Sequence, residues 1–242
     1  MKIKFYGTRG SYPTDAQMSC AWVEAPKGNF VIDLGSSDLF NDRARIASID
    51  HVLLTHFHPD HVAMLASLVL KRLTHHEAST SCTFVAPESV RDYMIFSGLT
   101  DVPSYTQLET VPKTWCGLQL EAVLTNHPKK NFAYKLSDEA TTLVWTGDTS
   151  YSPELVDFCR GADVIVCEAS MKEENIKQAI AWGHMTPSLF ANLMNEAKPN
   201  LAVATHFTEL EPDDFTTETK KHLAPSIELI TARDGLTLDF TS

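Results

Sequence analysis

The sequence has 242 residues, of which 43% are apolar, so it can bury one sizeable hydrophobic core. Its formal net charge is −11 without a long run of one sign, which argues against a broad basic surface for nucleic acid. No apolar run is long enough for a signal peptide or a membrane span. The chain is therefore expected in the cytoplasm, without a membrane partner.

Short strands fill the first part of the chain and then alternate with helices. Strands are predicted over residues 3–6, 20–24, 29–34, 51–55, 83–86, 118–125, 132–136, 142–146, 164–167, 201–205, 227–232 and 236–240. Helices are predicted over residues 38–47, 61–74, 153–160 and 187–197, with another opening at Pro87–Glu88. No linker divides the chain, so residues 1–242 are expected to form a single domain with an α/β fold.

The cysteines indicate no disulfide framework. They are odd in number, lack a C-x-x-C pair and mostly lie in or beside apolar runs, which is typical of buried free thiols. They are Cys20, Cys82, Cys116, Cys159 and Cys167.

A dense group of metal-ligand residues follows the predicted strand that ends at Thr55. His56, His58, Asp60 and His61 place three imidazoles and a carboxylate within six residues. Neutral imidazole and carboxylate are good ligands for zinc and its neighbours in the first transition row. His56 and His58 alternate, so they point the same way from an extended segment, whereas Asp60 and His61 approach from the next element. The alternative is a solvated loop with chance histidines, which this density disfavours.

These residues resemble the first motif of the metallo-β-lactamase superfamily, and four further motifs of that family follow the same order. Each lies at the end of an apolar run, and together they extend to residue 206. The resemblance implies a four-layer αββα sandwich in one domain. The four further matches are Asp33-Leu34-Gly35, His127, Gly147-Asp148-Thr149 and His206.

The resemblance also implies two divalent metal ions, with zinc favoured and manganese or iron as alternatives. Two adjacent metals would share a hydroxide and lower its pKa toward neutrality, which provides the nucleophile of a hydrolase. Asp148 would bridge the metals. The first metal is assigned to His56, His58 and His127, and the second to Asp60, His61 and His206.

The loop at Gly183-His184-Met185-Thr186 resembles the Gly-His-Ser/Thr loop of the phosphodiesterase branch of this superfamily. In that branch the loop histidine contacts phosphate and assists the leaving group, so His184 is expected to be catalytic; the alternative is an ordinary loop histidine. Glu168 ends an apolar strand and either orients a histidine or caps the following turn. We therefore expect Asp60, His184 and Glu168 to act in catalysis, Asp60 while also ligating a metal.

The expected activity is hydrolysis of a small phosphodiester, such as a cyclic nucleotide. tRNA-processing members commonly carry a long RNA-gripping arm, and in bacterial members it lies between the third-motif histidine and the bridging aspartate. Here only 21 positions separate His127 from Asp148, and two strands are predicted there. A lactone or thioester hydrolase and a non-catalytic metal sensor remain as alternatives. The oligomeric state is open, and a homodimer is compatible with the sequence.

Overall fold

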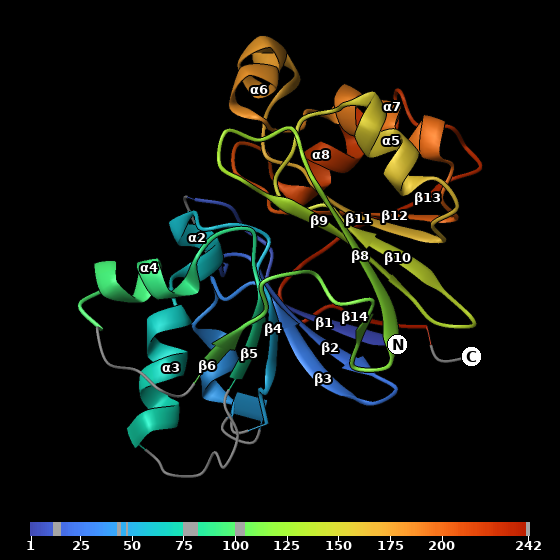
Figure 1. Cartoon of the computed structure of the whole chain (residues 1–242). Coiled ribbons are helices and arrows are strands. Elements are labelled where there is room, and N and C mark those ends of the chain that lie inside the picture. The colour runs from blue at the N-terminus through green and yellow to red at the C-terminus, as the bar shows by residue number, and fades with distance from the viewer. Residues whose placement is uncertain (12–15, 43–44, 47, 75–81, 100–104, 241–242) are drawn as a thin grey trace.

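Two mixed β-sheets lie face to face in the computed structural model of the chain, which describes residues 1–11, 16–42, 45–46, 48–74, 82–99 and 105–240 (Figure 1). In spatial order, the first sheet consists of β14 (Thr237–Asp239), β1 (Lys2–Gly7), β2 (Cys20–Ala25), β3 (Gly28–Ile32), β4 (His51–Leu53), β5 (Cys82–Val85) and β6 (Tyr105–Gln107). The second consists of β13 (Glu228–Thr231), β12 (Leu201–Thr205), β11 (Val164–Glu168), β10 (Thr142–Trp145), β9 (Phe132–Ser137), β8 (Leu118–Leu124) and β7 (Thr114–Trp115).

Each sheet has an antiparallel half and a parallel half. In the first sheet β14, β1, β2 and β3 pair antiparallel, and β3 to β6 pair parallel. In the second sheet β7 to β10 pair antiparallel, and β10 to β13 pair parallel. Parallel neighbours end at the same edge of a sheet, so the loops that follow them gather in one place.

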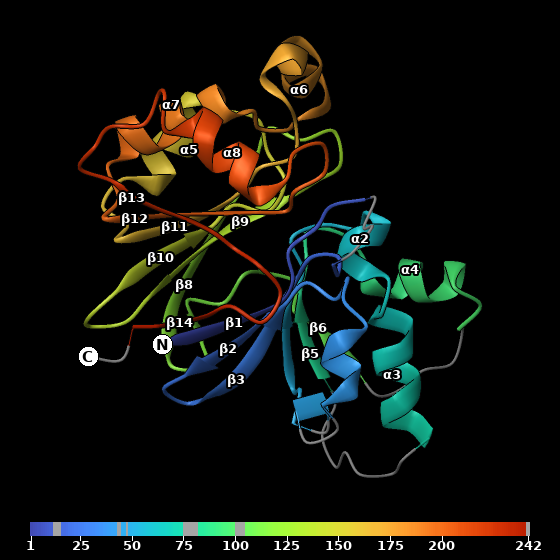
Figure 2. The same cartoon turned by 180° about the vertical axis from the view of Figure 1, so that it is seen from behind.

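Helices cover the outer face of each sheet, as the view from behind shows (Figure 2). On the first sheet these are α2 (Pro59–Val62), α3 (Leu65–Thr74) and α4 (Val90–Phe96). Over the second sheet lie α5 (Pro153–Cys159), α7 (Pro187–Ala197) and α8 (Pro212–Thr219), with α6 (Ile176–Trp182) projecting beyond them. The molecule is thus the expected four-layer αββα sandwich. No helix in the described part of the chain is long and apolar enough to span a bilayer.

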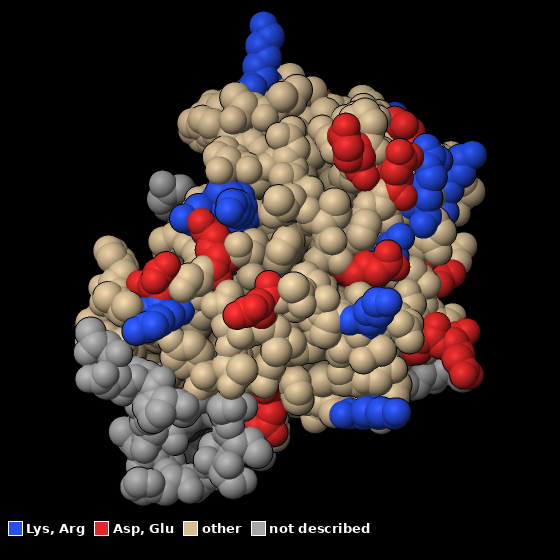
Figure 3. Space-filling view, viewed as in Figure 1, with Lys and Arg blue, Asp and Glu red and all other residues tan. Residues whose placement is uncertain are grey.

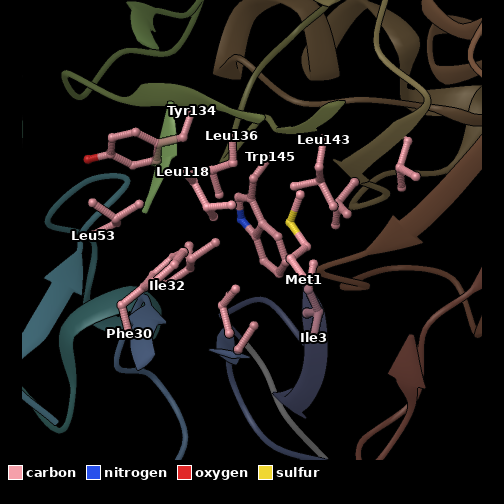
Figure 4. Close-up of a cluster of buried hydrophobic side chains, with 14 of the residues drawn as sticks. Met1, Ile3, Phe30, Ile32, Leu53, Leu118, Tyr134, Leu136, Leu143 and Trp145 are labelled. Carbon is pink, nitrogen blue, oxygen red and sulfur yellow. The ribbon is translucent and has the colours of Figure 1, made fainter. Parts of the chain in front are cut away.

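Alternating side chains on the strands build three layers of core. In β11, Val164 and Val166 face the other sheet, whereas Ile165 and Cys167 face the outer helices. This is the period of two that a strand imposes on its side chains. The core between the sheets contains Phe30 and many other buried apolar residues, which meet from both sides in Figure 4. Burial on both faces explains why the central strands read as continuous apolar runs.

Several predicted helix boundaries were wrong. The helix predicted from His61 begins at Pro59 and is interrupted after Val62, because the amide of Met64 donates to the carbonyl of Leu34 at 2.8 Å. The helix predicted to open at Pro87 begins at Val90, where the side chain of Ser89 accepts a bond from the amide of Asp92.

Within the helix predicted over residues 38–47, Asp38–Asn41 form a short 3-10 helix, η1, and residues 45–46 are α-helical. Positions 43, 44 and 47 lie outside the described residues. Apart from the 3-10 helix over Glu173–Asn175, four elements of the described residues were not predicted. Each is short, three residues or fewer in the strands and eight or fewer in the helices, so its periodicity is weak. They are β6, β7, α6 and α8.

Candidate metal centre

The seven predicted ligands come together at the edge where the parallel strands end. His56 and His58 follow β4, whereas Asp60 and His61 lie on the short helix α2. The other three follow β8, β10 and β12 of the second sheet. They are His127, Asp148 and His206, so the centre draws its side chains from both sheets.

Three imidazoles of the first cluster converge on one point. The Nε2 atom of His56 lies 2.9 Å from Nδ1 of His58, and that atom lies 3.2 Å from Nε2 of His127. With Asp148, each of these residues offers a ligand atom within 4.8 Å of the others. This is the donor set that was assigned to the first metal.

The second cluster contains Asp60, His61 and His206. The Nε2 atoms of the two histidines are 3.1 Å apart, and Oδ2 of Asp60 lies 3.1 Å from Nε2 of His206. All three residues are buried, and their ligand atoms also lie within 4.8 Å of one another.

Asp148 lies between the two clusters and turns one oxygen to each. Its Oδ1 is 3.3 Å from His61 and 3.4 Å from His206, while Oδ2 is 3.6 Å from His56. Oδ1 is buried and has no hydrogen-bond partner among the described residues. A buried carboxylate oxygen without a hydrogen bond is unfavourable, and a metal ion would satisfy it. The residues present therefore fit divalent metal ions, which the two clusters would hold with Asp148 facing both.

Hydrogen bonds behind the ligands orient their rings. The Nδ1 atom of His61 lies 2.7 Å from a carboxylate oxygen of Asp33, and Nδ1 of His206 lies 2.9 Å from the hydroxyl of Ser170. Nδ1 of His127 donates to the carbonyl of Gly183 at 3.1 Å. In each case the bond engages Nδ1 and leaves Nε2 for a metal, which is how outer hydrogen bonds select a ligand's tautomer.

The electrostatics of the clusters favour a bound cation. Burial lowers the pKa of His56, His58 and His127, so these imidazoles are neutral donors. Burial also opposes a charge on His61 and His206, but nearby carboxylates, Asp148 foremost, outweigh it and raise both pKa values. The carboxylates thus place a negative field on the second cluster, which attracts positive charge.

His184 and Glu168 form a pair beside the clusters. Nδ1 of His184 lies 2.7 Å from Oε1 of Glu168 and 4.0 Å from Oδ2 of Asp148. Burial disfavours the imidazolium, yet the Glu168 carboxylate raises the pKa of His184 to about 9. Glu168 also accepts bonds from the amides of Thr149, Ser170 and Met185. Both roles considered for Glu168, orienting a histidine and capping a turn, therefore have a structural basis.

Asn131 belongs to the centre although no sequence pattern marked it. Its side-chain amide donates to the carbonyl of Thr146 at 2.9 Å, and its oxygen accepts from the amide of Asp148 at 3.2 Å. The residue is fully buried. One polar residue at the start of an apolar strand was the only available signal.

The fold and the two clusters are those of the metallo-β-lactamase architecture, and residues 31–207 match the family model of the β-lactamase superfamily domain. The chain belongs to this superfamily. The probable metallo-hydrolase YhfI of Bacillus subtilis is 21% identical over 213 residues, which cover 85% of this chain and 86% of YhfI. The uncharacterized protein Rv1339 of Mycobacterium tuberculosis is 32% identical over 188 residues, which cover 70% of this chain and 68% of Rv1339.

Solved structures share the complete fold. The crystal structure of YhfI superposes with a TM-score of 0.86 at 22% identity and covers 98% of both chains. The short form of human tRNase Z superposes with a TM-score of 0.78 at 18% identity over 100% of both chains. By family and ligand set, the chain is a metallo-hydrolase of the β-lactamase superfamily with candidate metal-binding clusters of His and Asp.

Proposed function

We propose that the protein is a metal-dependent phosphodiesterase that hydrolyses a small phosphodiester such as a cyclic nucleotide. The observation that carries the proposal is the pair of His184 and Glu168, which lies against the bridging Asp148. The Glu168 carboxylate raises the pKa of His184 to about 9, which favours the protonated imidazole. A positioned cation can contact a phosphate oxygen and then give a proton to the leaving oxygen, where charge develops.

Each part of the centre has its own task in this reaction. Bound at the two clusters, two divalent metals would supply an activated water and neutralise charge on the phosphoryl oxygens. Glu168 holds Nδ1 of His184, so Nε2 is the nitrogen that donates to the substrate. Asp33 and Ser170 keep His61 and His206 in their ligand orientation.

The size and charge of the molecule favour a small substrate over a structured RNA. The interval between His127 and Asp148 contains β9 and β10, which pair with each other in the second sheet. On the face drawn in Figure 3, acidic and basic side chains of the described residues are interspersed and form no continuous basic area. Binding to a structured RNA would depend on a continuous basic surface.

The reaction class is tested by comparing substrates on the metal-loaded protein. Metal content is measured first, and about two divalent ions per chain are expected. Turnover of bis(p-nitrophenyl) phosphate is then measured beside a lactone and a thioester. The phosphodiester should be cleaved fastest. If the lactone or the thioester is cleaved at least tenfold faster than the phosphodiester, the protein is instead a lactone or thioester hydrolase.

The role of His184 is tested by His184→Ala, with the exposed His222→Ala as the matched control. We expect both variants to retain two metals, and kcat of His184→Ala to fall by roughly 10²–10⁴, the usual contribution of a positioned acid. The loss should be smaller for a p-nitrophenyl ester, whose leaving group hardly needs a proton, than for a cyclic nucleotide. Full activity of His184→Ala on the cyclic nucleotide would show that His184 has no catalytic role.

A further inference from the structure

An aromatic pocket lies beside the first ligand loop and next to α4. Its volume is about 510 Å³, within the range of small-molecule sites, and its lining is largely apolar. The rings of Phe57, Tyr93 and Phe96 line it. Nothing in the reaction described above uses these three side chains.

The pocket borders the two loops that carry the histidines of the first cluster. Phe57 stands between the ligands His56 and His58 in the sequence, and Lys129, which also lines the pocket, follows the ligand His127 by two residues. Consecutive Cα atoms are only ~3.8 Å apart, so the backbone beside the pocket lies within one or two residues of the backbone that carries these ligands. In Figure 1, α4 runs beside α2, the helix that carries Asp60 and His61.

The pocket offers aromatic surface on which a planar group can stack. The rings of Phe57 and Tyr93 are 5.8 Å apart and tilted by 51°. The hydroxyl of Tyr93 donates to the carbonyl of Val62 at 3.1 Å, which ties α4 to α2 and holds the ring in place. Phe96 is 89% exposed at the end of α4. An exposed phenyl ring at the rim of an apolar pocket is well placed to stack on a planar ligand.

The charges around the pocket favour a neutral ring over a second phosphate. Glu88 and Asp92 line it with carboxylates, against the single ammonium of Lys129, which lies 3.1 Å from Glu88. Carboxylates repel a phosphate but accept hydrogen bonds from N–H groups. A nucleobase combines a flat aromatic face with N–H donors at its edge.

We infer that this pocket binds the base of a nucleotide whose phosphate lies at the metal clusters, an inference that rests on the proposed function. The base would stack on the aromatic rings and place its N–H groups near Glu88 or Asp92. The protein would then select cyclic nucleotides over phosphodiesters that carry no base, with Phe96 as a residue that determines specificity.

The binding test uses the metal-loaded protein and isothermal titration calorimetry with adenosine 5′-monophosphate and ribose 5-phosphate. The nucleotide should bind about tenfold more tightly, the usual gain from stacking one base. Phe96→Ala should remove most of this preference without changing the affinity for ribose 5-phosphate, and Phe96→Trp should retain it. Ile95→Ala is the matched control, because Ile95 is the preceding residue of α4, is 47% exposed and lies outside the pocket lining. Equal affinities for the two ligands, or equal effects of Phe96→Ala and Ile95→Ala, would overturn the inference.

Turnover separates this inference from the proposed function. A protein that cleaves no phosphodiester but loses its nucleotide preference in Phe96→Ala would contradict the proposed activity and support the pocket. A protein that cleaves cyclic phosphates with and without a base equally well, and does so unchanged in Phe96→Ala, would support the activity and contradict the pocket.

Discussion

At the scale of single residues, Asp33 is a side chain outside the predicted ligand set that orients one of the ligands by hydrogen bonding. Its two oxygens accept bonds from the amide and hydroxyl of Thr55 at 2.8 Å each, and one also meets Nδ1 of His61. The residue is buried and has a φ of 58°, a left-handed conformation in which Asn and Asp are the best tolerated side chains after glycine.

Asp33→Asn should therefore fold but hold the second metal less tightly. Asn preserves the shape and the φ angle and removes the charge behind His61, and outer-shell changes of this kind typically weaken metal affinity by about 10–100-fold. Competition with a chelator, followed by metal analysis, measures the loss for each metal. Asp42→Asn, at a half-buried position away from the centre, should behave as the wild type. Unchanged affinity in Asp33→Asn would mean that the hydrogen bond to His61 is not needed for ligation.

The buried thiol of Cys159 is expected to make the stability of the protein depend on pH in the alkaline range. Burial raises the pKa of Cys159 from 9.0 to about 12. The native chain thus keeps this proton longer than the unfolded chain, so the stabilisation is complete below about pH 9 and is lost as the pH rises toward 12. Each pH unit in that window should lower the free energy of unfolding by ~1.4 kcal/mol through this thiol. Urea unfolding at a series of pH values should show a shallower decline in Cys159→Ala; an identical decline would contradict the assignment.

At the scale of elements, the turn after α6 holds the loop of His127 in place. Gly183 ends α6 with a φ of 72°, and a Cβ atom there would lie 2.7 Å from Cα of His127. Gly161, after α5, has a similar φ of 76°, but a Cβ atom there would meet nothing within 4 Å. The two glycines share a backbone conformation and differ in their surroundings.

Comparing Gly183→Ala with Gly161→Ala should therefore distinguish the effect of backbone strain from the effect of displacing His127. Each should lose roughly 1–2 kcal/mol of stability because a left-handed conformation is unfavourable for alanine. Only Gly183→Ala should also move His127, and a misplacement of about 1 Å can reduce turnover on the order of 100-fold. Thermal unfolding and kcat for the phosphodiester are measured for both. A Gly183→Ala variant with full activity would show that the loop can adjust without cost to the centre.

At the scale of the whole molecule, the metals would join the two sheets. His56, His58, Asp60 and His61 come from the first sheet side, and His127, Asp148 and His206 from the second. An ion bound in either cluster therefore connects segments far apart in the sequence, and a ligand that binds only the native state raises its stability by mass action.

Removing the metals with a chelator should lower the melting temperature on the order of 10 °C, the shift expected when a ligand at about a thousand times its Kd is withdrawn. Restoring zinc should restore the temperature, and Asp148→Ala should respond little to either treatment because both clusters lose their shared carboxylate. A wild-type melting temperature that is insensitive to the chelator, once metal loss is verified, would contradict a structural role for the metals.

Much of this architecture could be predicted from the chain alone. Continuous apolar runs predicted the central strands β10, β11 and β12, because parallel strands buried on both faces need apolar residues throughout. The dense cluster from His56 to His61 indicated a metal site, because a stretch of six residues rarely contains three histidines and an aspartate unless they bind a metal. The resemblance to the ordered motifs of the metallo-β-lactamase superfamily then nominated His127, Asp148 and His206 as partners.

Other features were decided only by tertiary contacts. The interruption between α2 and α3 follows from the bond between Met64 and Leu34, which no local periodicity contains. Asn131 acquires its role because β9 brings it to the backbone of Asp148, and the pairing of His184 with Glu168 depends on the loop after α6 returning over β11. The aromatic pocket likewise forms only where α4 packs beside the ligand loop. Local sequence specifies which side chains are available and how each strand alternates, whereas distances between groups remote in the chain arise from the packing of the two sheets.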